Sequence, residues 1–423
     1  MIEKKILSNG ILIVAEELPY LRSVSIGIWI LTGSSSEDIS NNGISHFLEH
    51  MLFKGTEQRS AKEIVEELDS VGGQLEAFTS REFTCYTAKV LDNHVSIALD
   101  VLHDMVVNSI FPNEEMRKEK GVVQEEIYMH EDTPQEQIHD LFASTIWKDH
   151  PLGSSILGTE KNVKNFTRET IMEYYKKHYC ANNIVITAAG NLKAANFFLE
   201  VENLFSSLFS GKIYSDSKIP KMHTDIYLKK KDLEQVHFCL GTRGLSFTHP
   251  KRYSLYLLNS LLGGSMSSRL FQAVREKHGL VYSVYSYQAS YKPSGLFAVY
   301  AGSAENNFEK VVEVVLDELN KLKKELISEK ELSNNKEQLK GGITLNLENT
   351  ESRMGHLAKS EIYFQEYITI EDIFKNIDNV KIIDIINFAQ ELFKPENMNM
   401  VVIGKAKEKF DERIKKMIED KLS

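Results

Sequence analysis

The sequence predicts an α+β protein of two structurally similar domains, each a mostly antiparallel sheet packed with helices. The chain has 423 residues, more than one hydrophobic core usually serves, so two domains of roughly 200 residues are expected. Strand-like runs rich in β-branched and aromatic residues alternate with pairs of helical segments. The order of elements in the first half recurs in the second, although residue identity does not, which indicates a weak duplication.

The first half is interpreted from hydrophobic periodicity and residue type. In chain order we expect a strand at 23–31, a helix from about residue 42, a strand at 74–90, helices at 92–109, 114–130 and 167–178, and a buried strand at 183–189. The strand runs SVSIGIWIL and NIVITAA are the clearest of these signals.

The composition turns polar around residues 210–223, SGKIYSDSKIPKMH, which is the best linker candidate. We therefore expect domains at 1–212 and 226–423, joined by a linker at 213–225. The elements expected in the second domain are a strand at 236–240, helices at 252–262 and 266–277, strands at 281–289 and 295–301, a helix at 307–326 and a strand at 398–403.

Composition excludes several classes of protein. A hydrophobic content of 42% and a charged content of 26% are ordinary globular values, and the net charge of −10 argues against a general nucleic-acid binder. The apolar stretch at the N-terminus is short and is broken by Asn9 and Gly10, so we expect neither a signal peptide nor a membrane span. Three isolated cysteines form no C-x-x-C pair, which favours a reducing compartment and predicts a cytoplasmic protein.

One helical segment carries a group of metal-binding residue types. Residues 42–56 read NGISHFLEHMLFKGT, in which apolar residues recur at helical spacing. His46 and His50 are four residues apart and present their imidazoles from adjacent turns of one face, so the pair can hold a divalent metal ion. Glu49 lies at the edge of that face, where it can take a proton from a metal-bound water. This is the H-x-x-E-H arrangement.

The alternative interpretation of this segment is an exposed polar helix face without a metal. The flanking apolar residues argue against it because they leave little of the helix exposed; they are Phe47, Leu48, Met51, Leu52 and Phe53. A buried His-Glu-His cluster without a metal would need hydrogen-bonding partners for several polar atoms. The motif therefore favours a metal site.

A hydrolytic zinc site needs a third protein ligand and an open position for water. The candidate segment is 113–130, NEEMRKEKGVVQEEIYMH. Glu119 and Glu126 are nearly two helical turns apart and point the same way, so one carboxylate is placed to bind the metal while the other supports the site. Spacing alone does not choose Glu126 over Glu125, and a solvated Glu-rich helix is the alternative.

The segment HFLEHMLFKGT closely resembles the zinc-helix signature of the pitrilysin and mitochondrial-processing-peptidase family, the inverted zincins. The stretch GVVQEEIYMHEDTPQEQIHDLF is similar to the family's second site helix. The resemblance implies one zinc ion per chain with His46, His50 and Glu126 as ligands, because the family's spacing from the second histidine selects Glu126. It also implies Glu49 as the catalytic base and Glu119 as the supporting carboxylate.

Residues 72–91, GGQLEAFTSREFTCYTAKVL, are similar to the family's active-site edge strand, where substrate docks as an added β-strand. The resemblance places Ala77 and Phe78 at the substrate. The family usually has Asn-Ala in this strand, whereas this chain has Glu76 before Ala77. Either Glu76 puts a negative charge near the metal, or its side chain points to solvent.

In the second half, LLGGSMSSRLFQAVREKHGLVYSVYS resembles the family's glycine-containing segment and its Arg/Tyr pair, here Arg275 and Tyr282. The resemblance implies that Tyr282 hydrogen-bonds the oxyanion formed from the scissile carbonyl and that Arg275 holds a substrate carbonyl. Without the resemblance, the two residues would be interpreted as an interfacial arginine and a core tyrosine.

The resemblance implies a zinc metalloendopeptidase that hydrolyses extended peptides, leader or presequence-like segments, or small unfolded proteins inside a closed chamber. The chain is similar to the half-size branch of the family, which implies a homodimer. Arg275 and Tyr282 of one subunit would then reach the metal of the other. A heterodimer with a catalytically silent homologue is the alternative assembly, and neither nucleic acid nor membrane is an expected partner.

Two functions without catalysis compete with this interpretation. One is a structural subunit, as in the respiratory-complex core proteins that resemble this family; those typically have damaged zinc motifs, whereas His46, Glu49, His50 and Glu126 are all present here. The other is a peptide-binding partner of an active homologue, in which Glu76 suppresses turnover. Zinc content and peptide cleavage distinguish both from an enzyme.

Overall fold

The protein forms two compact units in a computed structural model that describes residues 1–212, 218–324, 327–405 and 410–423. Unit 1 comprises Met1–Met129, Ser154–Asp216 and Leu345–Tyr367, and unit 2 comprises His130–Gly153, Ser217–Thr344 and Ile368–Ser423. No helix of the described residues combines the length and the apolar run that a membrane crossing requires.

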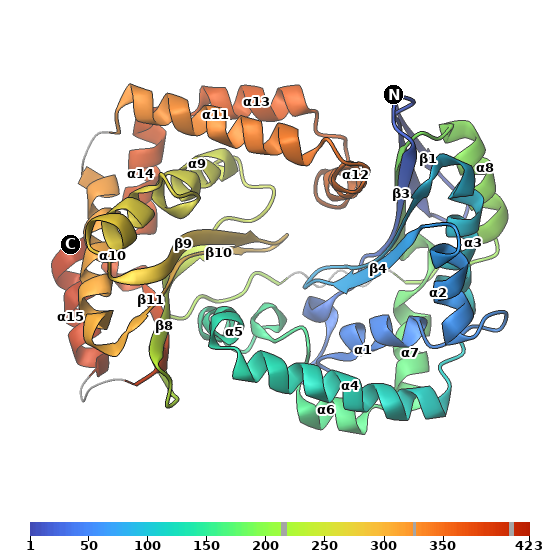
Figure 1. Cartoon of the computed structure of the whole chain (residues 1–423), viewed down its shortest axis with the longest axis horizontal. Coiled ribbons are helices and arrows are strands. Elements are labelled where there is room, and N and C mark those ends of the chain that lie inside the picture. Colours follow the sequence, from blue (N-terminus) through green and yellow to red (C-terminus); the bar gives the residue numbers. More distant parts are fainter. Residues whose placement is uncertain (213–217, 325–326, 406–409) are drawn as a thin grey trace. The chain divides into compact units, whose positions relative to one another are not determined.

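Unit 1 is built on a six-stranded sheet with the spatial order β1-β2-β6-β3-β5-β4 (Figure 1). Its strands are β1 (Ile2–Ile6), β2 (Leu12–Glu17), β3 (Ser23–Ile30), β4 (Gln74–Thr79), β5 (Thr84–Leu91) and β6 (Ile184–Gly190). Its helices are α1 (Ile44–Leu52), α2 (Ala61–Asp69), α3 (Val95–Asn108), α4 (Asn113–Asp132), α6 (Glu160–Asn165), α7 (Arg168–His178), α8 (Ala194–Phe205) and α12 (Thr350–Phe364).

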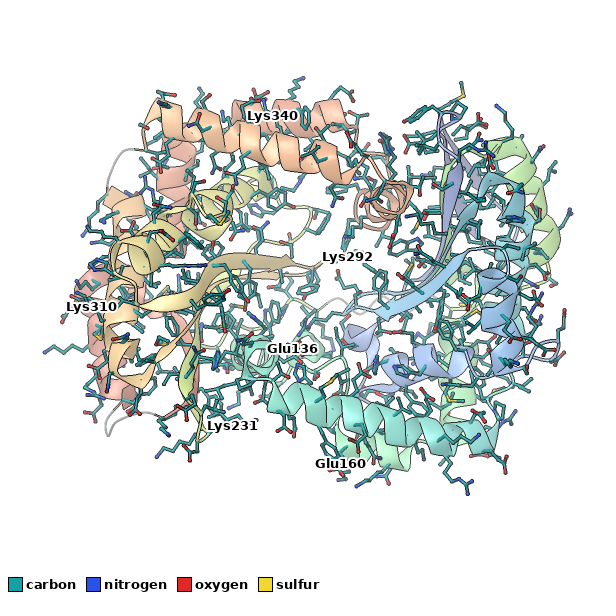
Figure 2. The ribbon with its side chains drawn as sticks, in the orientation of Figure 1. Glu136, Glu160, Lys231, Lys292, Lys310 and Lys340 are labelled. Carbon is teal, nitrogen blue, oxygen red and sulfur yellow. The ribbon has the colours of Figure 1, made fainter. Side chains whose placement is uncertain are left out.

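Unit 2 is built on a five-stranded sheet with the order β7-β11-β8-β10-β9. Its strands are β7 (Ile226–Lys230), β8 (Gln235–Gly244), β9 (Val281–Ser290), β10 (Gly295–Ala304) and β11 (Asn399–Gly404). Its helices are α5 (Pro134–Ile146), α9 (Arg252–Gly263), a π-helix (Phe271–Lys277), α10 (Phe308–Lys324), α11 (Glu329–Asn346), α13 (Ile370–Asn379), α14 (Ile382–Leu392) and α15 (Phe410–Leu422). Figure 2 shows Lys310 at the outer surface of α10, where a charge stays solvated.

The two sheets have the same topology. Strands β2 to β6 of unit 1 lie in the order β2-β6-β3-β5-β4, and strands β7 to β11 of unit 2 lie in the order β7-β11-β8-β10-β9. In each sheet one pair is parallel, β2 with β6 and β7 with β11, and the other pairs are antiparallel. The predicted fold class, two similar domains with mostly antiparallel sheets, is therefore confirmed.

The first half of the chain contributes one helix, α5, to unit 2, and the second half contributes one helix, α12, to unit 1. Helix α5 lies on β8 and β11, whereas α12 lies on β2, β3 and β6. The compact units thus differ from the expected division at 1–212 and 226–423, because an amphipathic helix buries its apolar face on whichever sheet it reaches. The expected linker at 213–225 falls partly on residues 213–217, which lie outside the described residues.

Two expected elements differ in detail from the structure. The strand expected at 74–90 is a hairpin of β4 and β5. Ser80 closes the turn because its backbone N–H and its hydroxyl both donate to the Phe83 carbonyl, and its hydroxyl accepts from the Phe83 N–H. The helix expected at 266–277 is a π-helix limited to Phe271–Lys277. Both differences arise from local turn and helix geometry that hydrophobic periodicity does not specify.

Strand β3 lies at the centre of unit 1 and is buried on both faces. On one face its alternate residues Val24, Ile26 and Ile28 pack into a core shared with α1, α3 and α4. On the other face Trp29 packs against Met354 and other residues of α12. Because both faces are covered, the strand is buried along nearly its whole length, and its core face lies in the same hydrophobic cluster as α1.

Candidate metal centre

Helix α1 is anchored by its apolar stripe. The residues of the stripe are fully or almost fully buried in the core of unit 1; they are Ile44, Phe47, Leu48, Met51 and Leu52. Because these residues fix one side of the helix, His46, Glu49 and His50 are held on the other side, where His46 and Glu49 are also buried. The exposed polar face that was the alternative interpretation is therefore not observed for these two residues.

The N-terminus of α1 is capped by a carboxylate from outside the helix. The N-cap residue Gly43 has a φ of +96° and makes no side-chain cap. Instead, buried Glu37 accepts hydrogen bonds from the backbone N–H groups of Gly43 and Ser45 and from the amide of Asn42. A carboxylate is favoured at this end of a helix because the free N–H groups and the helix dipole are positive there. This cap fixes the first turn of α1, which carries His46.

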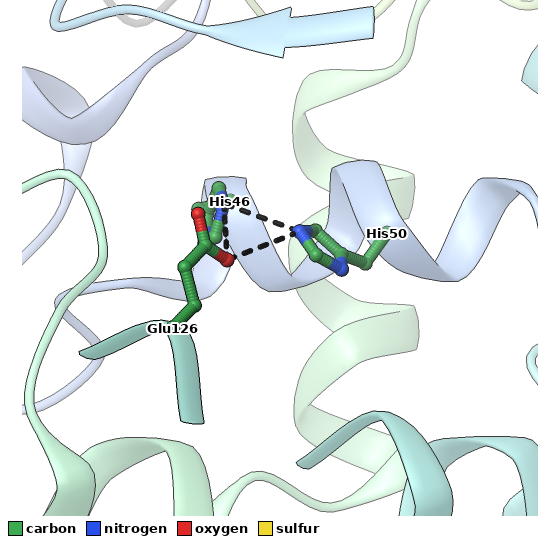
Figure 3. A group of neighbouring side chains, drawn as sticks. All are labelled: His46, His50 and Glu126. Atoms are coloured by element: carbon green, nitrogen blue, oxygen red, sulfur yellow. Dashed lines mark hydrogen bonds and ion pairs between the residues drawn. The ribbon is translucent and has the colours of Figure 1, made fainter. Parts of the chain in front are cut away.

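The third candidate ligand comes from α4. Glu126 Oε2 lies 3.6 Å from His46 Nε2 and 3.6 Å from His50 Nε2, and the two Nε2 atoms lie 3.2 Å apart (Figure 3). Its neighbour Glu125 is exposed. Spacing alone left this choice open, and the tertiary structure brings Glu126, not Glu125, to the imidazole pair.

These three atoms fit a tetrahedral zinc ion. Because zinc–nitrogen bonds are about 2.0–2.1 Å long, two ligand atoms of a tetrahedral ion lie about 3.4 Å apart. The separations of 3.2 and 3.6 Å bracket this value. Two imidazoles and a carboxylate are also the donor types of hydrolytic zinc sites, in which water occupies the fourth position.

The two candidate imidazole ligands differ in their electrostatic surroundings. Burial, together with the neighbouring charge of His50, lowers the pKa of His46 to about 3, so this imidazole is neutral. His50 Nδ1 lies 2.8 Å from Glu119 Oε1. A carboxylate only accepts hydrogen bonds, so Nδ1 of His50 carries a proton, and Nε2 is the ring nitrogen that faces His46 and Glu126.

Glu119 is buried but ionised. Burial raises the pKa of its carboxyl, but hydrogen bonds from His50 and Lys54 outweigh that effect and hold the pKa below its ordinary value. For His50, burial lowers the pKa, but the bond to Glu119 and the charge of Glu49 outweigh it and raise the pKa. Both shifts stabilise the contact between His50 and Glu119, which orients the imidazole.

Glu49 lies beside the candidate ligands and is bound by the edge strand. Thr79 of β4 donates a hydrogen bond of 2.5 Å to Glu49 Oε2. Burial raises the pKa of Glu49, while the bond from Thr79 opposes the rise. A carboxyl whose pKa is raised towards neutrality is suited to accept a proton and later return it.

Strand β4 is the outer strand of the unit 1 sheet and pairs only with β5 among the described strands. Leu75 and Ala77 face the core that contains α1, whereas Phe78 contacts Trp29 on the opposite face. Successive side chains of a strand point to opposite faces, so Glu76 lies on the face opposite to Ala77 and Thr79. Because Thr79 binds Glu49, the side chain of Glu76 points away from Glu49, and it is exposed. Of the two interpretations of Glu76, the structure favours the side chain that points to solvent.

Arg275 and Tyr282 lie in unit 2, on the π-helix and on β9. The Arg275 guanidinium is 4.9 Å from the ring centre of Tyr282, at cation–π distance. The structure thus brings this pair together within its own unit. Tyr282 is 79% exposed, so the interpretation of this residue as a core tyrosine is wrong.

Three residues that touch this centre were not identified from the sequence. Thr79 binds Glu49, Lys54 binds Glu119, and Glu37 caps α1. The signal available for Lys54 was its place in the segment HFLEHMLFKGT, four residues after His50. Thr79 and Glu37 carried no such signal, because a strand residue and a loop carboxylate acquire these contacts only when the chain folds.

The site and the fold can be compared with known proteins. Residues 12–160 match the family described as "Insulinase (Peptidase family M16)", and residues 165–339 match "Peptidase M16 inactive domain". A Bacillus subtilis protein named uncharacterized zinc protease YmxG is 45% identical over 393 residues, which cover 93% of this chain and 96% of the relative. An uncharacterized zinc protease of Streptomyces coelicolor is 38% identical over 98% of this chain and 92% of the relative.

Solved structures share the two-unit fold. A protease from Helicobacter pylori superposes with a TM-score of 0.88 at 23% identity and covers 96% of this chain and 99% of that chain. A peptidase M16 inactive domain from Pseudomonas fluorescens superposes with a TM-score of 0.90 at 19% identity, over 96% and 98% of the two chains. The two family matches and the identity of 45% to the Bacillus subtilis relative over 93% of this chain lead to the same conclusion. The chain belongs to the insulinase family of peptidases, family M16.

Proposed function

We propose that this chain is a zinc-dependent endopeptidase that hydrolyses extended peptides, leader-like segments or small unfolded proteins. The observation that carries the proposal is the convergence of His46, His50 and Glu126, whose ligand atoms all lie within 4.8 Å of one another, beside the buried carboxylate of Glu49. The names of the relatives, zinc proteases, support the same activity.

A zinc ion held by His46, His50 and Glu126 would lower the pKa of a bound water to about 7 and polarise a peptide carbonyl. Glu49 accepts the proton of the attacking water. Since Thr79 binds Oε2 of Glu49, Oε1 is the oxygen without a hydrogen bond from the described residues and is the one that receives the proton. Glu49 then returns this proton to the leaving amine.

The outer edge of β4 supplies the substrate site in this proposal. An extended peptide can pair with the free backbone groups of the edge strand at Ala77 and Phe78. This mode recognises the backbone conformation more than the sequence, so it requires a substrate segment that is not folded. It supports peptides and unfolded segments as the substrate class.

Tyr282 and Arg275 complete the proposed site. We propose that the protein acts as a homodimer in which the Arg275–Tyr282 pair of one subunit reaches the metal centre of the other, where the Tyr282 hydroxyl donates to the oxyanion and Arg275 binds a substrate carbonyl. The support is the location of the pair and of the metal residues in separate units of the chain, together with the exposure of Tyr282.

The proposed function is tested by zinc content and by cleavage of unstructured fluorogenic peptides. Glu49→Gln is expected to keep zinc and to lose cleavage by about 10²–10⁴-fold, the range for general-base catalysis. Glu126→Gln is expected to lose zinc, and the neighbouring exposed Glu125→Gln is the matched control that keeps both. Cleavage by zinc-depleted wild type, or by Glu49→Gln at the wild-type rate, would refute the proposal.

A further inference from the structure

Lys54 extends the contacts of the metal centre by one residue. Its ammonium lies 2.6 Å from Glu119 Oε2, while Oε1 of the same carboxylate contacts His50 Nδ1 at 2.8 Å. Lys54, Glu119 and His50 therefore form a continuous chain of charge-assisted contacts that ends at a candidate ligand. The Glu119 side chain is 5% exposed and that of Lys54 27%, so solvent screens this contact less than a surface pair.

The backbone places Lys54 at the joint between the two helices of the site. Gly55, with a φ of +120°, turns the chain directly after Lys54, a conformation that favours glycine. The backbone N–H of Ile110 donates to the Gly55 carbonyl, and Thr56 forms an antiparallel bridge with Ser109. This loop thus connects the end of α1 to the segment that leads into α4, and Lys54 adds a side-chain link to α4.

The charge of Lys54 has a further consequence for the centre. Glu49, Glu119 and Glu126 bring three negative charges to the site, and a zinc ion would supply two positive charges. Lys54 supplies the third and lies against the one carboxylate of the three that is neither a candidate ligand nor the proposed base. A lysine at this position therefore pairs with Glu119 and does not contact the other two carboxylates.

Of the two imidazoles, only that of His50 contacts a carboxylate of the described residues through Nδ1. Nδ1 of His46 is buried and makes no hydrogen bond to the described residues. The orientation of His50, in contrast, depends on Glu119. Control of the ligand geometry by the surrounding residues is thus concentrated on His50.

We propose that Lys54 is a positioning residue of the metal centre. Its ammonium fixes the Glu119 carboxylate so that Oε1 accepts the Nδ1 proton of His50, and the Nε2 lone pair of that imidazole then points at the metal. The inference rests on the proposed zinc function and goes beyond it by assigning a role to a residue that touches neither metal nor substrate.

The test compares Lys54→Met, which keeps the length of the side chain without its charge, with Lys54→Arg, which keeps the charge. The matched control is Lys118→Met, because Lys118 also pairs at 2.6 Å with a glutamate of α4, Glu115, but on the exposed side. Apparent zinc affinity is measured by competition with a chelator. We expect about tenfold weaker zinc binding for Lys54→Met, the lower end of the range for residues that orient metal ligands through hydrogen bonds. Lys54→Arg should recover most of the zinc affinity, and Lys118→Met should not change it.

A second readout separates positioning from general stabilisation. Nitrogen-15 spectra of the zinc-free protein report which ring nitrogen of His50 carries the proton, and Lys54→Met is expected to reduce the population with the proton on Nδ1. In a Glu119→Gln background, Lys54→Met is expected to have no further effect on zinc affinity, because Lys54 acts through Glu119. If Lys54→Met does not fold, Lys54→Gln replaces it in both measurements.

The outcomes distinguish this inference from the proposed function. Equal zinc affinity in wild type and Lys54→Met, or an undiminished loss in the Glu119→Gln background, would overturn the role of Lys54 while leaving the zinc peptidase intact. Failure of the wild-type protein to bind zinc at all would overturn the proposed function itself.

Discussion

The hydroxyl of Thr79 donates a hydrogen bond of 2.5 Å to Oε2 of Glu49. Thr79 is the last residue of β4, the edge strand at which we propose that substrate binds, and Glu49 on α1 is the proposed base. The strand and the base are therefore connected by one side-chain bond. In the proposed mechanism, substrate docking and proton transfer would therefore depend on the same short segment of structure.

Removal of this bond is expected to shift the pH dependence of cleavage. Glu49 acts as a base only when it is ionised; burial raises its pKa and the Thr79 bond lowers it, so loss of the bond raises the pKa further. Thr79→Val should move the acidic limb of the kcat/KM profile upward by about one pH unit, since a hydrogen bond to a charged group contributes about 1.5–3 kcal/mol. Thr79→Ser keeps the hydroxyl and is the control. An unshifted limb in Thr79→Val would contradict this role.

The proposed exchange of Tyr282 between subunits can be tested by mixing inactive variants. Glu49→Gln and Tyr282→Phe should each be inactive or severely impaired, the second by about 10²–10³-fold as for loss of an oxyanion donor. In a mixed dimer, one site combines an intact metal centre with an intact Tyr282. Random mixing should therefore restore about a quarter of wild-type activity, because half of the dimers are mixed and each has one intact site.

The control for this mixing experiment is Tyr227→Phe, which changes another exposed tyrosine of unit 2 and should remain active alone. Light scattering checks that the variants are dimers. If subunit exchange is demonstrated and activity still does not recover, Tyr282 acts within its own chain or not at all.

Substitution of Glu76 is expected to leave the metal centre unchanged. Its side chain lies on the face of β4 opposite to Thr79 and is exposed, so its charge is screened by solvent. Glu76→Gln should change apparent zinc affinity by less than about twofold, whereas Glu126→Gln should abolish tight binding. The measurement is the same chelator competition. A large change in zinc affinity for Glu76→Gln would show that its charge reaches the metal.

The loop after α1 is fixed by a buried ion pair whose loss should destabilise unit 1. Asp104, with 1% exposure, accepts from Arg59 at 2.9 Å and from the Thr56 hydroxyl at 2.5 Å. Asp104→Ala should lower the free energy of unfolding by about 1–3 kcal/mol, because the Thr56 hydroxyl and one Arg59 N–H lose their buried acceptor while Glu67 and Asp100 still pair with Arg59. Asp100 pairs with the same arginine but is half-exposed, so Asp100→Ala should cost less than about 1 kcal/mol. Urea denaturation followed by circular dichroism measures both.

The contribution of Asp104 to stability should also depend on pH. Burial would raise its pKa, but hydrogen bonds from Thr56, Asn108 and Arg59 outweigh this and hold the pKa below the ordinary value of 3.8. Because the pKa is lower in the folded state, the stabilisation is complete above the unfolded value and is lost as pH falls through the folded value. The difference in unfolding free energy between wild type and Asp104→Asn should be constant near neutral pH and shrink below about pH 4. A constant difference down to pH 3 would contradict the assignment.

Much of this protein could be predicted from the sequence because the information is local. The positions of His46, Glu49 and His50 on one helix follow from helical periodicity, and the strands at 23–31 and 183–189 follow from runs of β-branched residues. The duplication was visible as a repeated order of elements, and the order that five strands of the first sheet share with the five strands of the second confirms it. The family resemblance was visible in the segment around these histidines and in three further segments, one of them in the second half of the chain.

Other features depended on contacts between distant segments. The sequence did not indicate that α5, from the first half, packs on the sheet of unit 2 or that α12, from the second half, packs on the sheet of unit 1. Amphipathic spacing identifies the apolar face of a helix but not the surface on which that face packs. Nor did it indicate the contacts of Thr79 and Lys54 with the carboxylates of the site.

By itself the sequence determined which residue types stand at helical spacing on α1 and which fold class the chain adopts. Helical spacing alone left Glu125 and Glu126 open and the family resemblance selected Glu126; the tertiary structure brings Glu126 to the imidazoles. Only the tertiary structure decided that Glu76 lies on the other face of its strand. The physical reason is that spacing along a helix or strand fixes direction only relative to that element. The packing of α4 and β4 against α1 decides which of those directions points at the metal centre.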